Sequence, residues 1–248
     1  MTSYILRIKS VSEIDKTVLD KYSNSSLFGK FLNLFLEEGA ESGDVYVAWE
    51  NNKQEGIFVY DSVENAGTCF TFRKDIAKEF MQLKENMDFY TEIDLNLKGL
   101  TEEVHRLKLD SGNLNINIRN EIEIFHGDQI EEVLTFMKQA YGKVSERWIK
   151  SSLNHGEKCF LCRKDGVIYG MSWLGRVSIY GRLHSLYVSE NYRQMGIGSD
   201  LLAARILWAE HTGIKELISE IPLESPFSKK IAEKNGFEVV GRIYHYKS

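Results

Sequence analysis

The strongest constraint on the fold is a turn containing two glycines between a short apolar strand and a helix, within residues 186–202. The turn reads Arg193-Gln194-Met195-Gly196-Ile197-Gly198, an Arg-x-x-Gly-x-Gly order. Gly196 and Gly198 allow a close backbone approach to a ligand because neither carries a Cβ. The first amides of the following helix lack intrahelical acceptors, so they and the helix dipole favour an anion. Together with the charge of Arg193, this pattern predicts a phosphate-binding turn.

Spacing decides which kind of phosphate site this is. A dinucleotide fingerprint needs a third glycine where this chain has Leu201, and a P-loop needs Lys and Ser/Thr where it has Ser199-Asp200. The remaining pattern resembles the acyl-CoA pyrophosphate loop of the GNAT superfamily of N-acetyltransferases. Residues 216–221 are similar to the fifth strand of that family, and residues 232–237 resemble its closing Gly-Phe segment.

The resemblance implies an α/β fold with a mixed sheet, the GNAT-like acyl-CoA N-acyltransferase fold. It also implies acetyl-CoA as the acyl donor, held between splayed fourth and fifth strands. The residues expected to contact this cofactor are Leu186, Tyr187, Val188, Arg193, Gln194, Met195, Gly196, Ile197, Gly198, Ser199, Ser225 and Ser228.

The second half of the chain alternates strands and helices, as an α/β unit should. Strands are expected at residues 121–125, 158–163, 168–177, 183–188, 215–221 and 237–246, and helices at 128–141, 145–153, 199–211 and 225–234. Ser145 is the expected N-cap of the second helix. Lys164-Asp165-Gly166 predicts a hairpin turn.

An internal repeat extends this organisation to the first half. At an offset of 114 residues Gly56 aligns with Gly170 and Gly67 with Gly181, and residues 90–93 align with 218–221 at an offset of 128. The first copy is therefore 14 residues shorter (128 minus 114) where the second carries its glycine turn. We expect two tandem GNAT-like units: residues 1–115, degenerate and without a cofactor loop, and residues 116–248. Residues 95–112 are polar, and the joint is expected at 110–113.

Composition narrows the partners. The chain is 43% hydrophobic and 27% charged, with a net charge of −5 and no basic run, which argues against nucleic acid. The N-terminal residues lack the apolar region of a secretory signal, and no apolar stretch in the sequence approaches the length of a membrane span, so a cytoplasmic protein is expected. The three cysteines fit a reducing compartment. Cys159 and Cys162 fall on opposite faces of a strand, and no metal site is expected.

Acetyl transfer to an amine needs a base, and the resemblance places that role on Glu220 near the end of the fifth strand. Glu190 and His184 are alternatives. The general-acid Tyr of the family falls here on Ala232, which has no proton to donate. Another phenol could serve as the acid, with Tyr187 or Tyr244 considered first and Tyr192 and Tyr246 also available. Alternatively, the CoA thiolate could leave unprotonated.

The expected function is an N-acetyltransferase that moves an acetyl group from acetyl-CoA to a primary amine by direct attack in a ternary complex. The acceptor is a small-molecule amine or a peptide N-terminus, and its identity stays open, as does the oligomeric state. The alternative is a non-catalytic acyl-CoA-binding sensor or regulatory module, because one copy is degenerate and the other lacks the usual acid.

Overall fold

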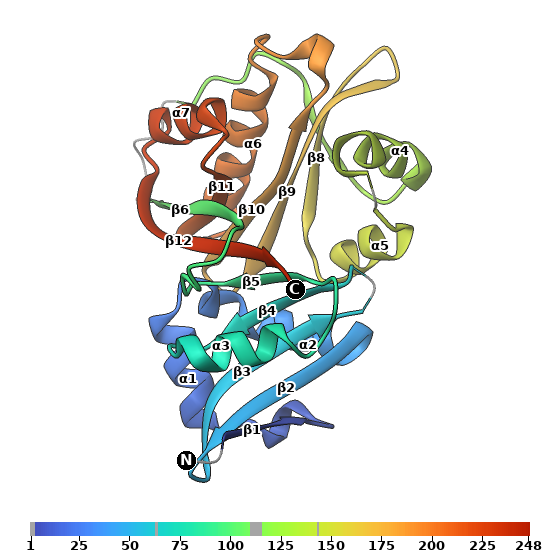
Figure 1. The fold of residues 1–248 in the computed structure, drawn as a ribbon. Coiled ribbons are helices and arrows are strands. Elements are labelled where there is room, and N and C mark those ends of the chain that lie inside the picture. Colours follow the sequence, from blue (N-terminus) through green and yellow to red (C-terminus); the bar gives the residue numbers. More distant parts are fainter. Residues whose placement is uncertain (1–2, 63, 110–115, 143) are drawn as a thin grey trace. The chain divides into compact units, whose positions relative to one another are not determined.

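The computed structural model describes residues 3–62, 64–109, 116–142 and 144–248 (Figure 1). The expected joint at residues 110–113 lies outside these residues. The chain forms two compact units. Unit 1 comprises Met1–Val104, Ile221–Ser225 and Val240–Ser248, and unit 2 comprises His105–Glu220 and Pro226–Val239.

Unit 1 is a sheet with flanking helices. Its strands are β1 (Ser3–Arg7), β2 (Gly43–Glu50), β3 (Lys53–Asp61), β4 (Ala66–Phe70) and β5 (Asp88–Thr91). The helices are α1 (Lys16–Ser25), α2 (Leu32–Ser42) and α3 (Lys74–Met81), with short 3-10 turns η1 (Val11–Glu13) and η2 (Phe28–Phe31). Neighbouring strands from β1 to β4 are antiparallel, and β4 pairs in parallel with β5.

Unit 2 repeats this plan. Its strands are β7 (Ile122–Phe125), β8 (Lys158–Lys164), β9 (Val167–Val177), β10 (Tyr180–Val188) and β11 (Glu216–Pro222). The helices are α4 (Ile130–Tyr141), α5 (Glu146–Asn154), α6 (Ile197–His211) and α7 (Pro226–Lys234), with the 3-10 turn η3 (Glu190–Tyr192). Strands β7 to β10 are antiparallel, and β10 pairs in parallel with β11. The mixed α/β fold expected from the sequence is confirmed.

Local signals explain several boundaries in unit 2. The Ser145 side chain accepts a hydrogen bond from the Trp148 amide and caps α5. Asp165 and Gly166 both have positive φ, 52° and 78°, as the tight hairpin between β8 and β9 requires. The predicted elements therefore begin and end within a few residues of the observed ones.

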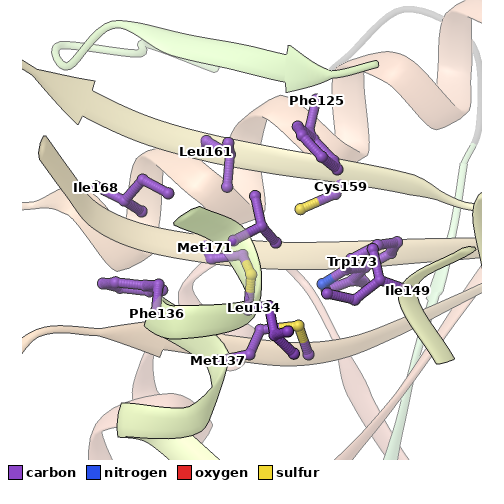
Figure 2. Close-up of a cluster of buried hydrophobic side chains, with 11 residues drawn as sticks. Phe125, Leu134, Phe136, Met137, Ile149, Cys159, Leu161, Ile168, Met171 and Trp173 are labelled. Atoms are coloured by element: carbon purple, nitrogen blue, oxygen red, sulfur yellow. The ribbon is translucent and has the colours of Figure 1, made fainter. Parts of the chain in front are cut away.

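The helices of unit 2 cover both faces of its sheet. Trp173 and Met171 of β9 point toward α4 and α5, where they join a buried cluster with Phe136, Met137 and Ile149 (Figure 2). The intervening Gly170 points to the other face, against α6. The cluster fixes the face of the sheet on which the first two helices of the unit lie.

The repeat inferred from the glycines is visible in the structure. Gly170 lies under α6, because a Cβ there would sit 2.7 Å from Ile197. Gly56 in β3 has the corresponding place under α3, where a Cβ would sit 2.9 Å from Phe80. In each unit the glycine lets a helix approach the sheet closely. The helix of unit 1 is short, 8 residues in α3 against 15 in α6.

Each unit includes part of a strand from the other half of the sequence. The next strand beside β5 in unit 1 is β12 (Glu238–Lys247), with Tyr244 opposite Thr91. The next strand beside β11 is β6 (Leu100–Lys108), whose Val104 and Leu107 are buried. From the sequence, residues 95–112 are noted only as polar, and strand β6 is not predicted. The proposed boundary between residues 115 and 116 stays a prediction about the repeat.

Candidate functional site

The edge of the site is strand β10, which carries a bulge. Its ladder with β9 shifts register between His184 and Tyr187, and Ser185 has a φ of 52°. The parallel ladder with β11 runs from Tyr180–Glu216 to Leu183–Ser219 and ends there. Beyond these pairs the backbone groups of Leu186, Tyr187 and Val188 are released from β11. This opening is where the resemblance places a pantetheine arm.

The phosphate turn follows directly. Gln194 and Gly196 have φ values of 66° and 85°, and Gly196 is the N-cap of α6. In the part of the chain that the structure describes, the amides of Ile197, Gly198 and Ser199 donate to no backbone acceptor. These N–H groups and the dipole of a 15-residue helix form an anion-binding end.

An acid in the first turn of α6 does not oppose an anion there. Asp200 is only 4% exposed, and its Oδ2 accepts hydrogen bonds from the Arg119 amide (3.1 Å), the Asn120 amide (2.8 Å) and Asn120 Nδ2 (2.7 Å). The carboxylate is thus bound by the segment before β7 and anchors the start of the helix. The sequence analysis gave this residue no role.

Arg193 borders the turn. Its Nε donates to the Val188 carbonyl at 3.2 Å, its guanidinium carbon lies 5.8 Å from the centroid of the Tyr187 ring, and its side chain is half exposed. Met195 is exposed beside it. The guanidinium is therefore oriented by β10 and still accessible to a ligand.

The residues expected near α7 are placed as follows. Ser228 lies in the first turn of α7, and Ala232 is buried. Gly198 faces Ile231, which a Cβ would meet at 3.7 Å, so α7 packs on the start of α6. Ser225 falls in the segment assigned to unit 1 and donates its amide to the Pro222 carbonyl at 2.9 Å.

Glu220 follows Ser219, the last residue of β11 that pairs with β10. Its side chain is 8% exposed, and Arg182 Nε lies 3.3 Å from each carboxylate oxygen. The aligned residue of the first copy, Glu92, accepts hydrogen bonds from Ser26 Oγ (2.5 Å) and the Phe28 amide (2.7 Å). The same position is thus a structural cap in unit 1 and an ion-pair partner in unit 2.

The other candidate acids and bases differ in their surroundings. Tyr187 packs against the rings of Phe136 and Tyr141, whereas Tyr244 belongs to a cluster in unit 1. Glu190 is exposed, 3.6 Å from Arg193. Within the described residues of unit 2, neither Tyr187 nor Glu190 forms a hydrogen bond or ion pair with Glu220.

His184 is the reserve base with a carboxylate partner. Its Nε2 lies 3.3 Å from Glu157 Oε2, and its Nδ1 lies 3.1 Å from Ser185 Oγ. Glu157, in the connection between α5 and β8, was not identified from the sequence. It belongs to no motif, and its only sequence signal is an acid directly before an apolar strand.

Unit 1 has no comparable anion-binding turn in its described residues. The N-cap of α3 is Arg73, with extended backbone (φ −115°), and its guanidinium is bound by Glu50 and by Asp75 in the first turn of the helix. The ion pairs occupy the place where unit 2 presents free amides.

Among the described residues there is no group of three or more His, Cys, Asp or Glu side chains arranged to hold a metal ion. Nor does any helix in these residues have the length and apolarity needed to cross a membrane.

Comparison with known proteins gives two kinds of match. The chain is 31% identical over 65 residues to aminoglycoside N(6')-acetyltransferase type 1 of Salmonella typhimurium and of Salmonella enteritidis, which covers 26% of this chain and 45% of each relative. The chain thus spans about half the length of the curated relatives it matches.

Two solved structures match nearly the whole chain and show its fold. A GNAT-family acetyltransferase from Colwellia psychrerythraea has a TM-score of 0.67 at 14% identity, covering 98% of this chain and 99% of its own. A tandem GNAT protein from the clavulanic acid biosynthesis pathway has a TM-score of 0.65 at 8% identity, covering 99% and 98%. The tandem GNAT-like fold is confirmed. Residues 123–237 match the model of the Acetyltransferase (GNAT) family.

Proposed function

We propose that this protein is an N-acetyltransferase that transfers an acetyl group from acetyl-CoA to a primary amine by direct attack in a ternary complex. The observation that supports this most is the pairing of two features in unit 2. The ladder between β10 and β11 ends at Leu183–Ser219, and α6 begins nearby with free amides behind Gly196. The end of the ladder between β10 and β11 suits the thioester arm of acetyl-CoA, and the free amides at the start of α6 suit its pyrophosphate.

In this proposal the pyrophosphate binds the amides of residues 194–199 and the Arg193 guanidinium. The pantetheine arm runs along Leu186, Tyr187 and Val188, whose backbone amides polarise the thioester carbonyl as it becomes an oxyanion. Ser225 and Ser228 complete the cofactor contacts. Unit 1 binds no cofactor, so each chain takes up one acetyl-CoA.

Glu220 is the proposed base. Arg182 fixes the Glu220 carboxylate just beyond the part of β11 that pairs with β10. This position suits removal of a proton from the acceptor ammonium through a water molecule. The neutral amine then attacks the carbonyl carbon, the C–N bond forms, and the CoA thiolate leaves. Because Ala232 carries no proton donor, protonation of that thiolate needs another group.

The acceptor is proposed to be a small-molecule amine or a peptide N-terminus. The curated relatives are aminoglycoside acetyltransferases, so an aminoglycoside is the first acceptor to test. A cytoplasmic site of action is part of the same proposal.

The test is release of CoA thiol from acetyl-CoA in the presence of kanamycin, spermidine or a short unblocked peptide, with calorimetry of acetyl-CoA binding in parallel. Amine-dependent thiol release supports the transferase. Binding of acetyl-CoA without thiol release with any amine would favour the alternative function, a non-catalytic acyl-CoA sensor.

A further inference from the structure

Two adjacent residues at the bulge of β10 have no part in the function proposed above. The His184 ring lies 3.1 Å through Nδ1 from Ser185 Oγ and 3.3 Å through Nε2 from Glu157 Oε2. Ser185 adopts a φ of 52°, in the left-handed region that non-glycine residues seldom occupy and that recurs at functional sites. Hydroxyl, imidazole and carboxylate thus stand in series.

Glu157 is placed to orient the imidazole. Its side chain is 9% exposed, and Gly175 makes room for it, because a Cβ there would sit 2.7 Å from Glu157 Oε1. Burial raises the pKa of Glu157, but the charge and hydrogen bond of His184, the charge of Arg182 and a hydrogen bond from Ser152 together hold that pKa below its usual value. An ionised carboxylate beside Nε2 favours a proton on that nitrogen. Nδ1 then has a free lone pair for the Ser185 hydroxyl.

The surroundings make a charge on this ring depend on Glu157. The rings of Trp173 and Trp148 flank His184 at 6.4 and 6.1 Å between centroids. Within the described residues, Glu157 Oε2, His184 Nε2 and Trp173 Nε1 are buried without an aligned hydrogen bond. A positive imidazolium between apolar walls needs a nearby anion, so the 3.3 Å contact should tighten when the ring takes up a proton.

We propose that Ser185, His184 and Glu157 form the proton relay of acetyl transfer. This inference rests on the proposed function. After Glu220 has removed the first proton, the amine attacks and the new C–N bond forms. The second N–H proton passes to Ser185 Oγ while the Ser185 proton moves to His184 Nδ1. As the C–S bond breaks, the imidazolium returns a proton through Ser185 to the thiolate, which leaves an amide and CoA thiol.

The relay supplies the proton donor that the Ala232 side chain cannot provide. In this chain the donor comes from β10, whereas the family pattern places it at the position of Ala232 on α7. Ser185 and His184 are the groups that move protons, and Glu157 is a positioning residue that acts through His184. The titratable and charged groups around the relay come from several elements: Arg182 on β10, Glu220 on β11 through Arg182, Tyr141 on α4 within hydrogen-bonding reach of Ser185, and Arg205 on α6 near Tyr141 and the Trp173 carbonyl.

The experiment compares the wild-type chain with Ser185→Ala, His184→Gln and Glu157→Gln. Alanine is no more strained than serine at this φ, so Ser185→Ala removes the hydroxyl alone. A matched control exists on α5, where Ser151 Oγ lies 3.3 Å from His155 Nδ1, and Ser151→Ala and His155→Gln remove an equivalent contact outside the site. Each protein is assayed for acetyl-CoA affinity, for kcat with the amine that wild type acetylates best, and for the pH dependence of kcat.

Proton transfer by a positioned side chain contributes about 10²–10⁴ in rate. We expect His184→Gln to lower kcat by about 10², at the lower end of that range, and the other two variants by about tenfold, which is below it. Acetyl-CoA affinity should not change. Glu157→Gln should also move a limb of the pH profile to lower pH, because the imidazolium has lost its carboxylate. A merely structural role for Glu157 would not shift the profile.

Three results would overturn the relay. Near-normal kcat and an unchanged pH profile in His184→Gln would remove the imidazole from the reaction while the proposed function stands. An acetyl group found on Ser185 by mass spectrometry would replace the relay with a covalent route. If wild type binds acetyl-CoA but releases no thiol with any amine, the proposed function fails and the relay fails with it.

Discussion

Replacing Gly196 with valine is the most direct test of the cofactor site. At a φ of 85° a β-branched residue is strained by about 1–2 kcal/mol, although the nearest atom to a Cβ, Asn120 Nδ2, is 3.9 Å away. The fold should therefore survive at reduced stability. Loss of two charge-assisted hydrogen bonds to the pyrophosphate, each about 1.5–3 kcal/mol, would weaken acetyl-CoA binding by about 10²–10⁴-fold.

Gly213 provides the control, at the opposite end of the same helix. Its φ is 82° and nothing lies within 4 Å of a Cβ, so Gly213→Val carries the same backbone strain without touching the proposed site. The melting temperature should fall by about 2–8 °C in both variants. Calorimetry should show loss of acetyl-CoA binding in Gly196→Val alone. Wild-type affinity in Gly196→Val, or equal losses in both variants, would refute the assignment of this turn to the pyrophosphate.

Further predictions concern charge and stoichiometry. Calorimetry should give one acetyl-CoA per chain, and two equivalent sites would contradict the assignment of the cofactor to unit 2 alone. Glu220→Gln should lower kcat/KM by about 10²–10⁴ at neutral pH with little change in acetyl-CoA affinity, with Glu216→Gln on the same strand as the control; near-normal turnover would place the base elsewhere. Asp200→Ala should destabilise the chain by about 3–5 kcal/mol, since three donors from residues 119–120 lose a buried carboxylate, and an unchanged melting temperature would disprove the anchor. Because the pKa of folded Glu157 is lowered, its stabilising contribution is present above the unfolded pKa of about 4.3 and is lost as the pH falls through the lower folded value, so acid unfolding should be less steep in Glu157→Gln.

Sequence reasoning predicted the strand, turn and helix of the candidate site, because these elements are encoded locally. The glycines at 196 and 198 indicate a turn, and the strand before it and the helix after it are each indicated by their own apolar pattern. The repeat could be recognised because Gly56 and Gly170 both lie where a helix packs closely on a strand, which leaves no room for a side chain.

What the sequence could not reveal depends on contacts between distant residues. Glu157 precedes His184 by 27 positions (184 minus 157), and the two meet only because β8 and β10 both pair with β9. The anchor between Asp200 and residues 119–120 likewise joins segments some 80 positions apart. Strand β6 escaped prediction altogether, because residues 95–112 showed only a polar composition and its place beside β11 depends on distant contacts.

The sharing of β6 and β12 makes the halves of this gene product dependent on each other. A fragment starting at residue 116 would lack the strand beside β11, and most of β12 would have no β5 to pair with. Unpaired N–H and C=O groups along such an edge attract other chains. The proposal gives residues 1–115 no ligand, but this half is expected to be needed for folding of the other: expressed separately, residues 116–248 should aggregate, and co-expression with residues 1–115 should restore them to solution.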